Sequence, residues 1–221
     1  DVTSVKNFLG KKIYEKRFRV SEGKKTFLKV KKSKNFFPIM SHDIMTNFNL
    51  FKKFKINFKM IQIYRNPFDL VYSWYKRGWG DRWKTDPQPN GLLIRKNNAL
   101  YPWYVAGKEK FWEKHNSVER CALLVNDLTQ RSINNNLKEK KNPNILIVSY
   151  EDFIENTNTS IQKICKFLRT KRTVITKKIL IKENCPKKYN KKNYLFKKKF
   201  IKSKVSKKIF NDILILEKKY K

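Results

Sequence analysis

The stretch KMIQIYRNPFDLVYSWYKR (residues 59–77) decides the fold of this 221-residue chain. Apolar and β-forming residues dominate Lys59–Tyr64, which predicts a buried strand. Asn66 is a good N-cap residue and Pro67 suits the first helical position, so a helix is expected directly after the strand, through about Arg77. Asp69 in its first turn complements the positive end of the helix dipole. The stretch therefore predicts a strand, a tight turn and a helix.

The predicted helix has an apolar face and a polar face, as expected for a helix that covers a core. The apolar face consists of Phe68, Tyr72 and Tyr75. The polar face consists of Asp69, Ser73, Lys76 and Arg77.

Further strands and helices are predicted along the rest of the chain. Further strands are expected at Thr26–Val30 and Ile145–Val148, and a long loop from Gly78 to Asn98. Helices are expected over Tyr101–Lys114, Ser117–Lys138, about Thr159–Leu168 and Ser206–Lys219. Asn116 and Glu119 are expected to form a capping pair. Strands that alternate with helices favour an α/β fold with a parallel sheet, here a single domain over residues 1–221.

The charge is strongly positive, with 53 basic against 18 acidic residues and a net charge of +35. Residues 177–221 form a lysine-rich C-terminal segment with 17 Lys, no Arg and three acids. A field this positive attracts polyanions, nucleotides or anionic surfaces. Lys together with Asn, Ile, Phe and Tyr is also what an A+T-rich genome would encode at permissive surface positions. Dedicated nucleic-acid binding is the functional alternative, although a basic surface alone supplies only non-specific attraction to phosphates.

Several classes of protein are excluded or disfavoured by composition. No apolar stretch reaches the roughly 18 residues of a bilayer-spanning helix, and no signal peptide is visible. Cys121, Cys165 and Cys185 are far apart and lack CxxC spacing, which argues against a zinc site or a disulfide framework. We therefore expect a cytoplasmic, reducing environment and no metal, with an upstream membrane anchor left open. The start at Asp1 suggests a fragment or a processed product.

Arg65 and Ser73 are candidates for binding an anion. Ligands of open parallel sheets bind beyond the carboxyl ends of the strands, where Arg65 is expected to lie. Its guanidinium can hold a phosphate through two parallel hydrogen bonds, and the helix N-terminus adds free N–H groups. Ser73, about two turns along the helix, can give a second contact to the same anion. The alternative is an Arg that caps the strand end and a Ser that faces water.

Residues 64–75 (YRNPFDLVYSWY) resemble the 3′-phosphate-binding motif of the PAPS-dependent sulfotransferase family, an Arg followed eight positions on by a Ser. Residues 147–153 (IVSYEDF), with a helix ending at Phe167-Leu168, resemble a second family segment. The resemblance covers about Phe36 to Leu168 and, weakly, the last helix. It implies that Arg65 and Ser73 hold the 3′-phosphate of 3′-phosphoadenosine 5′-phosphosulfate (PAPS), the co-substrate. It also implies a three-layer architecture like that of P-loop NTPases, with a central, mainly parallel sheet.

His42 is the candidate catalytic residue, because many sulfotransferases carry a general-base His at about this distance, 23 residues, before the Arg motif. A neutral imidazole suits removal of a proton from the acceptor. The alternative is a structural His bonded to loop backbone. For His115, at the end of a predicted helix, a capping role is expected. The implied reaction transfers a sulfuryl group from PAPS to an unidentified hydroxyl or amine acceptor without a metal, through a loose transition state.

The chain also departs from the family pattern. It has no Gly- and Ser/Thr-rich phosphosulfate loop, and Leu9–Lys12 does not match one. Met40–His42 stands where cytosolic members have Lys-Thr-His. Lys187–Lys192 occupies the place of the family's C-terminal Gly-x-x-Gly segment. We therefore expect an N-terminally incomplete sulfotransferase domain, whose activity as a fragment the sequence leaves open.

Two further questions are open at this level. Trp79 and Trp83 lie in the predicted loop and could line an acceptor pocket or pack in the core, whereas core packing is expected for Trp74, Trp103 and Trp112. A nucleotide kinase or other P-loop relative would need a GxxxxGK[ST] sequence, which this chain lacks. The sequence does not determine the oligomeric state.

Overall fold

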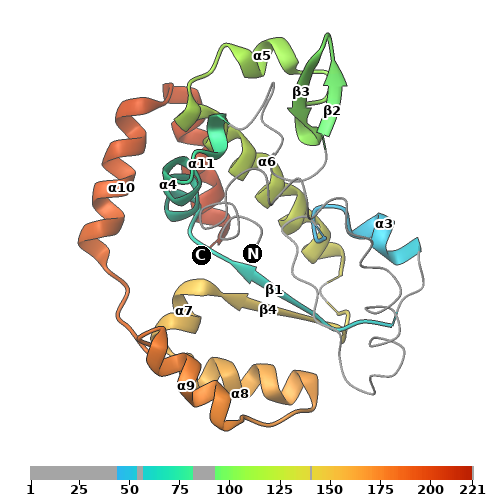
Figure 1. Ribbon diagram of the computed structural model, residues 1–221, viewed down its shortest axis with the longest axis vertical. Helices are drawn as coiled ribbons and strands as arrows, with labels where there is room; N and C mark the ends of the chain where they lie inside the picture. Colours follow the sequence, from blue (N-terminus) through green and yellow to red (C-terminus); the bar gives the residue numbers. More distant parts are fainter. Residues whose placement is uncertain (1–43, 54–56, 82–92, 140, 221) are drawn as a thin grey trace, which may run out of the picture. The chain divides into compact units, whose positions relative to one another are not determined.

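A computed structural model describes residues 44–53, 57–81, 93–139 and 141–220 (Figure 1). The strand expected at Thr26–Val30, His42 and Trp83 lie outside these residues. In chain order the elements are α3 (Phe48–Lys53), β1 (Met60–Tyr64), α4 (Pro67–Lys76), η1 (Trp79–Asp81), β2 (Leu93–Lys96), β3 (Ala99–Pro102), η2 (Trp103–Val105), α5 (Glu109–Glu113), α6 (Ser117–Lys138), β4 (Ile145–Ser149), α7 (Tyr150–Glu155), α8 (Thr157–Leu168), α9 (Val174–Lys182), α10 (Lys191–Lys204) and α11 (Lys207–Tyr220).

Two of the predicted strands are confirmed as β1 and β4, which pair in parallel. Their predicted burial is not confirmed, because Ile63 and Ile147 are exposed and, of the residues in these strands, only Val148 is buried. Their register runs from Met60 opposite Ile145 to Tyr64 opposite Ser149. The two carboxyl ends therefore meet at one edge of the sheet, and α4 and α7 begin there. In the described residues this parallel sheet has two strands. The α/β character is confirmed, and the three-layer, P-loop-like arrangement stays a prediction.

Helix α4 begins where the sequence predicts. The Asn66 side chain accepts a hydrogen bond from the Phe68 N–H, and Pro67 occupies the first turn. Its buried face, which includes Phe68, Val71 and Trp74, packs against α6. Asp69 belongs to the predicted polar face, but this part of the face is not solvent-exposed, because α10 covers it and leaves Asp69 2 % exposed.

Helix α6 is the long central helix, and its predicted bounds are confirmed. Asn116 and Glu119 form the expected capping box, in which each side chain bonds to the other residue's backbone N–H. The buried residues of α6 repeat at helical spacing, and the apolar ones include Cys121, Leu124, Val125 and Leu128. This repeat is why the sequence pattern located the helix correctly.

The region between α4 and α6 differs from the prediction. Part of the expected loop and the start of the expected helix at Tyr101–Lys114 form the antiparallel hairpin β2–β3 instead. Asn97 and Asn98 join the strands with φ values of 49° and 60°. Asn tolerates this left-handed conformation, which two-residue hairpin turns require, so the Asn-Asn pair was the missed signal. The expected helix is reduced to η2 and α5.

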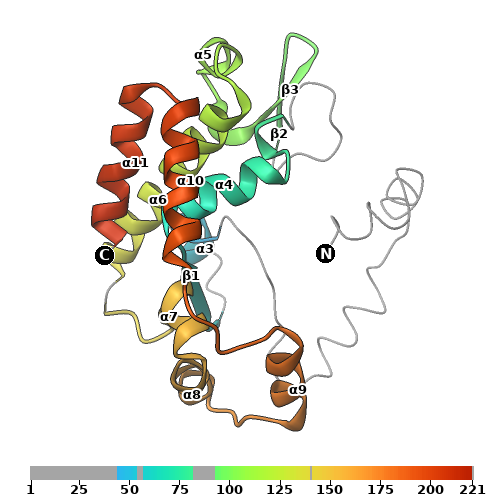
Figure 2. The ribbon, with the colours of Figure 1, turned by 90° about the vertical axis from the view of Figure 1, so that its left-hand side faces the viewer.

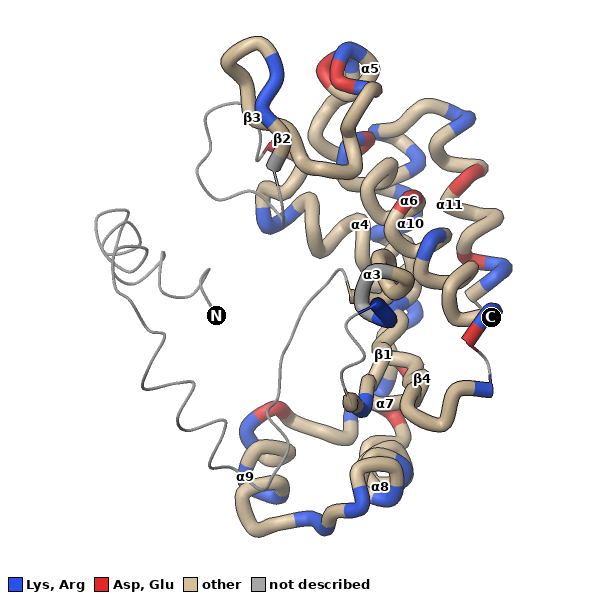
Figure 3. Tube along the Cα trace, turned by 90° about the vertical axis from the view of Figure 1, so that its right-hand side faces the viewer, with Lys and Arg blue, Asp and Glu red and all other residues tan. Residues whose placement is uncertain are grey.

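The last two helices of the lysine-rich C-terminal segment, α10 and α11, contribute to the core. The amphipathic helix expected at Ser206–Lys219 is confirmed as α11, and Ile209, Ile213 and Leu216 are buried with Ile201 of α10 in the same apolar cluster as α4 and α6. Figure 2 shows α10 alongside α4, in agreement with their contacts. Figure 3 shows Lys and Arg on many elements rather than on a single one. The single-domain organisation stays a prediction.

The four tryptophans among the described residues are buried in, or pack against, the apolar clusters. Trp79 is buried, with its ring centroid 4.6 Å from that of Trp74, so it belongs to the core. Trp112 is also buried, and Trp103 packs against the core. The three cysteines are free thiols, and burial raises the pKa of Cys121 to about 12. Within the described ranges, no helix is long and apolar enough to cross a membrane.

Candidate functional site

Arg65 lies at the carboxyl edge of the sheet, between β1 and α4. Its guanidinium carbon is 4.6 Å from the centroid of the Tyr150 ring, a cation–π contact with the first residue of α7. Its Nε is buried and has no hydrogen-bond partner in the described part of the chain. Among the described residues, no carboxylate forms an ion pair with Arg65. A buried donor without a protein partner is uncommon, which makes Arg65 a candidate for binding an external acceptor.

Ser73 belongs to the same strand–turn–helix unit. It is partly buried in the second turn of α4, roughly 10 Å along the helix axis from Asn66. The 3.6-residue repeat places Ser73 on the same side of α4 as Asn66 and Asp69. The fold thus places Arg65 before the helix and Ser73 on the helix, and the C-terminal segment contacts the start of this side at Asn66 and Asp69.

Backbone N–H groups contribute less at this helix end than expected. Pro67 has no N–H, Asn66 accepts from the Phe68 N–H, and the Leu70 N–H donates to the Asn66 carbonyl oxygen. The supply of free N–H groups expected from the helix N-terminus is therefore largely used up. An anion at this helix end would be bound mainly by side chains, above all by Arg65.

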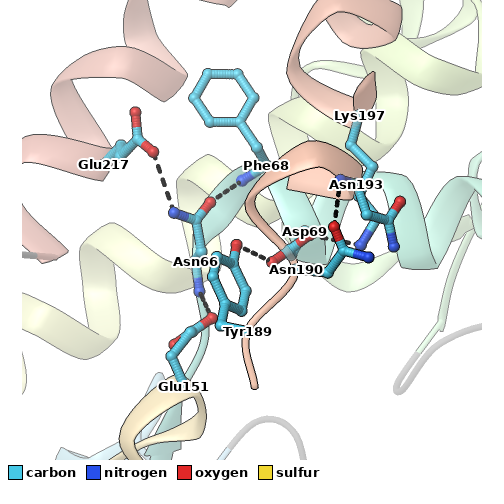
Figure 4. Close-up of polar contacts among 9 residues, drawn as sticks. All are labelled: Asn66, Phe68, Asp69, Glu151, Tyr189, Asn190, Asn193, Lys197 and Glu217. Atoms are coloured by element: carbon cyan, nitrogen blue, oxygen red, sulfur yellow. Dashed lines mark hydrogen bonds and ion pairs between the residues drawn. The ribbon is translucent and has the colours of Figure 1, made fainter. Parts of the chain in front are cut away.

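Asn66, the residue after Arg65, forms hydrogen bonds with several other residues (Figure 4). Its backbone N–H donates to Oε1 of Glu151 at 2.9 Å. Its side-chain Nδ2 donates to Oε1 of Glu217 at 3.0 Å, and its Oδ1 accepts from the Phe68 N–H at 2.9 Å. Asn66 thus joins the start of α4 to α7 and to α11.

Asp69 is neutralised from the C-terminal segment. Lys197 Nζ lies 2.6 Å from its Oδ1, and the Tyr189 hydroxyl donates to its Oδ2 at 2.5 Å. Burial and the hydrogen bond to Asp69 raise the pKa of Tyr189. Asp69 therefore adds little net negative charge beside Arg65 and Ser73.

Glu217 has a similar arrangement on α11. Its Oε2 accepts from Lys198 Nζ at 2.9 Å, and its Oε1 accepts from the Tyr194 hydroxyl as well as from Asn66. Burial acts to raise the pKa of Glu217, but these hydrogen bonds outweigh it and hold the pKa below its usual value. Glu217 is therefore a buried, paired carboxylate.

Glu151 receives further bonds at the end of β4. The Ser149 hydroxyl donates to its Oε2 at 3.3 Å and lies 2.9 Å from the Tyr220 hydroxyl, which also donates to Glu151. Burial, together with the bond to Glu151, raises the pKa of Tyr220. The tyrosine thus stays a neutral donor that orients the carboxylate toward Asn66.

Sequence reasoning assigned no site role to Tyr150, Glu151 or Glu217. The Tyr-Glu-Asp segment was recognised by resemblance only. The signal for Glu217 was its position four residues after Ile213, on the apolar stripe of α11. An acid at such a position must be paired if it is buried.

The remaining candidates are the two histidines. His42 lies outside the described residues, so its role as a general base stays a prediction. His115 follows α5, and its Nδ1 is 2.7 Å from the Phe111 carbonyl oxygen, consistent with the expected role at a helix end. Within the described parts of the chain, no group of three or more His, Cys, Asp or Glu could hold a metal ion.

Comparison with known protein families identifies the family of this chain. The family model described as Sulfotransferase domain matches residues 4–214, nearly the whole chain. The protein therefore belongs to the sulfotransferase domain family. Comparison with curated proteins and with solved structures gives no significant match.

Proposed function

We propose that this protein binds PAPS and transfers its sulfuryl group to an acceptor hydroxyl or amine, with Arg65 and Ser73 holding the 3′-phosphate. The observation that carries the proposal is the buried, unpartnered Nε of Arg65 at the carboxyl edge of a parallel sheet. Membership of the sulfotransferase family supports the reaction class. The absence of a carboxylate partner for Arg65 in the described residues supports an external anion as its partner.

The chemistry of Arg65 suits a phosphate dianion. Its planar guanidinium presents N–H groups in a fork that matches two phosphate oxygens, and the Tyr150 ring restricts its orientation. The Ser73 hydroxyl would donate one further bond. This grip lies away from the reacting sulfur, so it contributes by fixing the position of the donor.

In the transfer step, the acceptor oxygen or nitrogen attacks sulfur while the bond from sulfur to the 5′-phosphate oxygen breaks. The products are the sulfated acceptor and adenosine 3′,5′-bisphosphate. We assign removal of the acceptor proton to His42, on the resemblance alone. The positive field of the chain favours binding of the anionic donor and product.

A pair of nucleotides that differ only in the 3′-phosphate tests the proposal. Isothermal titration calorimetry measures the affinity for adenosine 3′,5′-bisphosphate and for 5′-AMP. A hydrogen bond to a charged group contributes about 1.5 to 3 kcal/mol, so loss of even one of the two Arg65 bonds in Arg65→Ala should weaken bisphosphate binding by at least roughly 10- to 100-fold. Its effect on 5′-AMP should be small, and Ser73→Ala should have a weaker effect of the same kind.

Arg95→Ala is the matched control, because it removes the same charge from an exposed position on β2. We expect it to leave both affinities unchanged. Equal binding of the two nucleotides by the unmodified protein would contradict the proposal. Tight, salt-dependent binding of duplex DNA that Arg65→Ala leaves intact would instead support the nucleic-acid alternative.

A further inference from the structure

The peptide group between Arg65 and Asn66 is hydrogen-bonded to a residue outside the β1–α4 unit. The N–H of this peptide belongs to Asn66 and donates to Glu151, from the element that follows β4. The Asn66 side chain is then fixed at both ends, by the Phe68 N–H and by Glu217. The direction in which Arg65 leaves the backbone therefore depends on α7 and α11 as well as on α4.

We infer that Glu217 is a positioning residue for the Arg65 guanidinium and acts through its hydrogen bond to Asn66. This inference rests on the proposed function, since it concerns the phosphate that Arg65 would bind. Glu217 lies 151 positions after Asn66, on the last helix. It acts on Arg65 through Asn66, so the proposed effect is on geometry.

The chemistry at position 217 supports a positioning role over simple packing. Glu217 is 5 % exposed and stands on an apolar helix face, where Ile213 and Leu216 supply the packing. Burying a carboxylate is costly, and a well-packed apolar side chain often stabilises such a place better. The carboxylate instead holds three donors from two other helices, namely Asn66, Tyr194 and Lys198.

Glu217 and Asp69, the two buried acids near Asn66, are paired with lysines, so they do not compete with a bound phosphate for the Arg65 guanidinium. Lys198 neutralises Glu217 and its neighbour Lys197 neutralises Asp69, at 2.9 Å and 2.6 Å. Both acids are thus satisfied by the lysine-rich segment rather than by Arg65. The Arg65 guanidinium keeps its charge available for an anion.

Exchanging the donor and the acceptor of the hydrogen bond between Asn66 and Glu217 tests the inference. Asn66→Asp keeps a side chain that caps the Phe68 N–H, but it places two carboxylates opposite each other. Asn66→Asp combined with Glu217→Gln restores a hydrogen bond with the donor on the other side and keeps the wild-type net charge. Glu183→Gln, at an exposed position, is the control for loss of an acid.

The measured quantity is the ratio of the dissociation constants for 5′-AMP and adenosine 3′,5′-bisphosphate. Partial unfolding weakens both nucleotides equally, so this ratio reports the 3′-phosphate grip rather than stability. We expect Asn66→Asp to lower the ratio about tenfold, as for coupled residues in contact. The double variant should return to within about threefold of wild type, and Glu183→Gln should not change the ratio.

Each outcome decides between the two claims. If the unmodified protein does not discriminate between the nucleotides, the proposed function fails. If it does, and Asn66→Asp keeps the full ratio or the double variant shows no recovery, the positioning role of Glu217 is wrong. Should Asn66→Asp fail to fold, Glu217→Gln alone decides, with an expected loss of about threefold in the ratio and an unchanged ratio as the contrary result.

Discussion

Removal of the last two helices should abolish cooperative folding, although these helices belong to the most basic part of the chain. A chain that ends at Asn190 loses Ile201, Ile209, Ile213 and Leu216, which are 0–5 % exposed in the main apolar cluster. Burial of one such side chain contributes about 1.5 to 3 kcal/mol, so the loss amounts to roughly 6–12 kcal/mol. The net stability of a typical protein is only about 5–15 kcal/mol.

Thermal unfolding followed by far-UV circular dichroism measures the effect. The shortened chain should show no sigmoidal transition, because the deletion exposes the apolar surfaces of α4 and α6 that α10 and α11 cover. A control replaces exposed lysines of α10 with glutamine and leaves the core intact; its positions are Lys191, Lys192, Lys199 and Lys202. This variant should melt within a few degrees of wild type. A shortened chain that melts sigmoidally at the wild-type midpoint would refute the reasoning.

Two further predictions concern the buried acids. Lys197→Met should lower the free energy of unfolding in urea by about 3 kcal/mol, because Asp69 is left as a buried charge without its partner. Adding Asp69→Asn should restore part of this stability. No recovery in the double variant would contradict a stabilising ion pair between Lys197 and Asp69. The folded-state pKa of Glu217 lies below its usual 4.5, so its stabilising contribution is complete above that pH and is lost as the pH falls further. The difference in melting temperature between wild type and Glu217→Gln should therefore shrink between pH 6 and pH 3, and a difference independent of pH would count against this.

Local chemistry explains where the predictions from sequence succeeded. The start of α4 depends on Asn66 and Pro67, which act on the backbone within one turn. Helix α6 depends on a capping box and a long apolar repeat. The region of β2, β3 and α5 was misassigned because short elements carry weak periodicity, and tertiary packing decides between them.

The sequence alone determined the unit of strand, turn and helix that holds Arg65 and Ser73, because caps and periodicity lie within about twenty residues of one another. It also located α11, whose apolar stripe is visible in a single helix. Only the tertiary structure decided that Asp69 is buried and that Asn66 is joined to Glu151 and Glu217. Those bonds connect residues 85 and 151 positions apart, and no local pattern specifies which distant side chains the folded chain brings together.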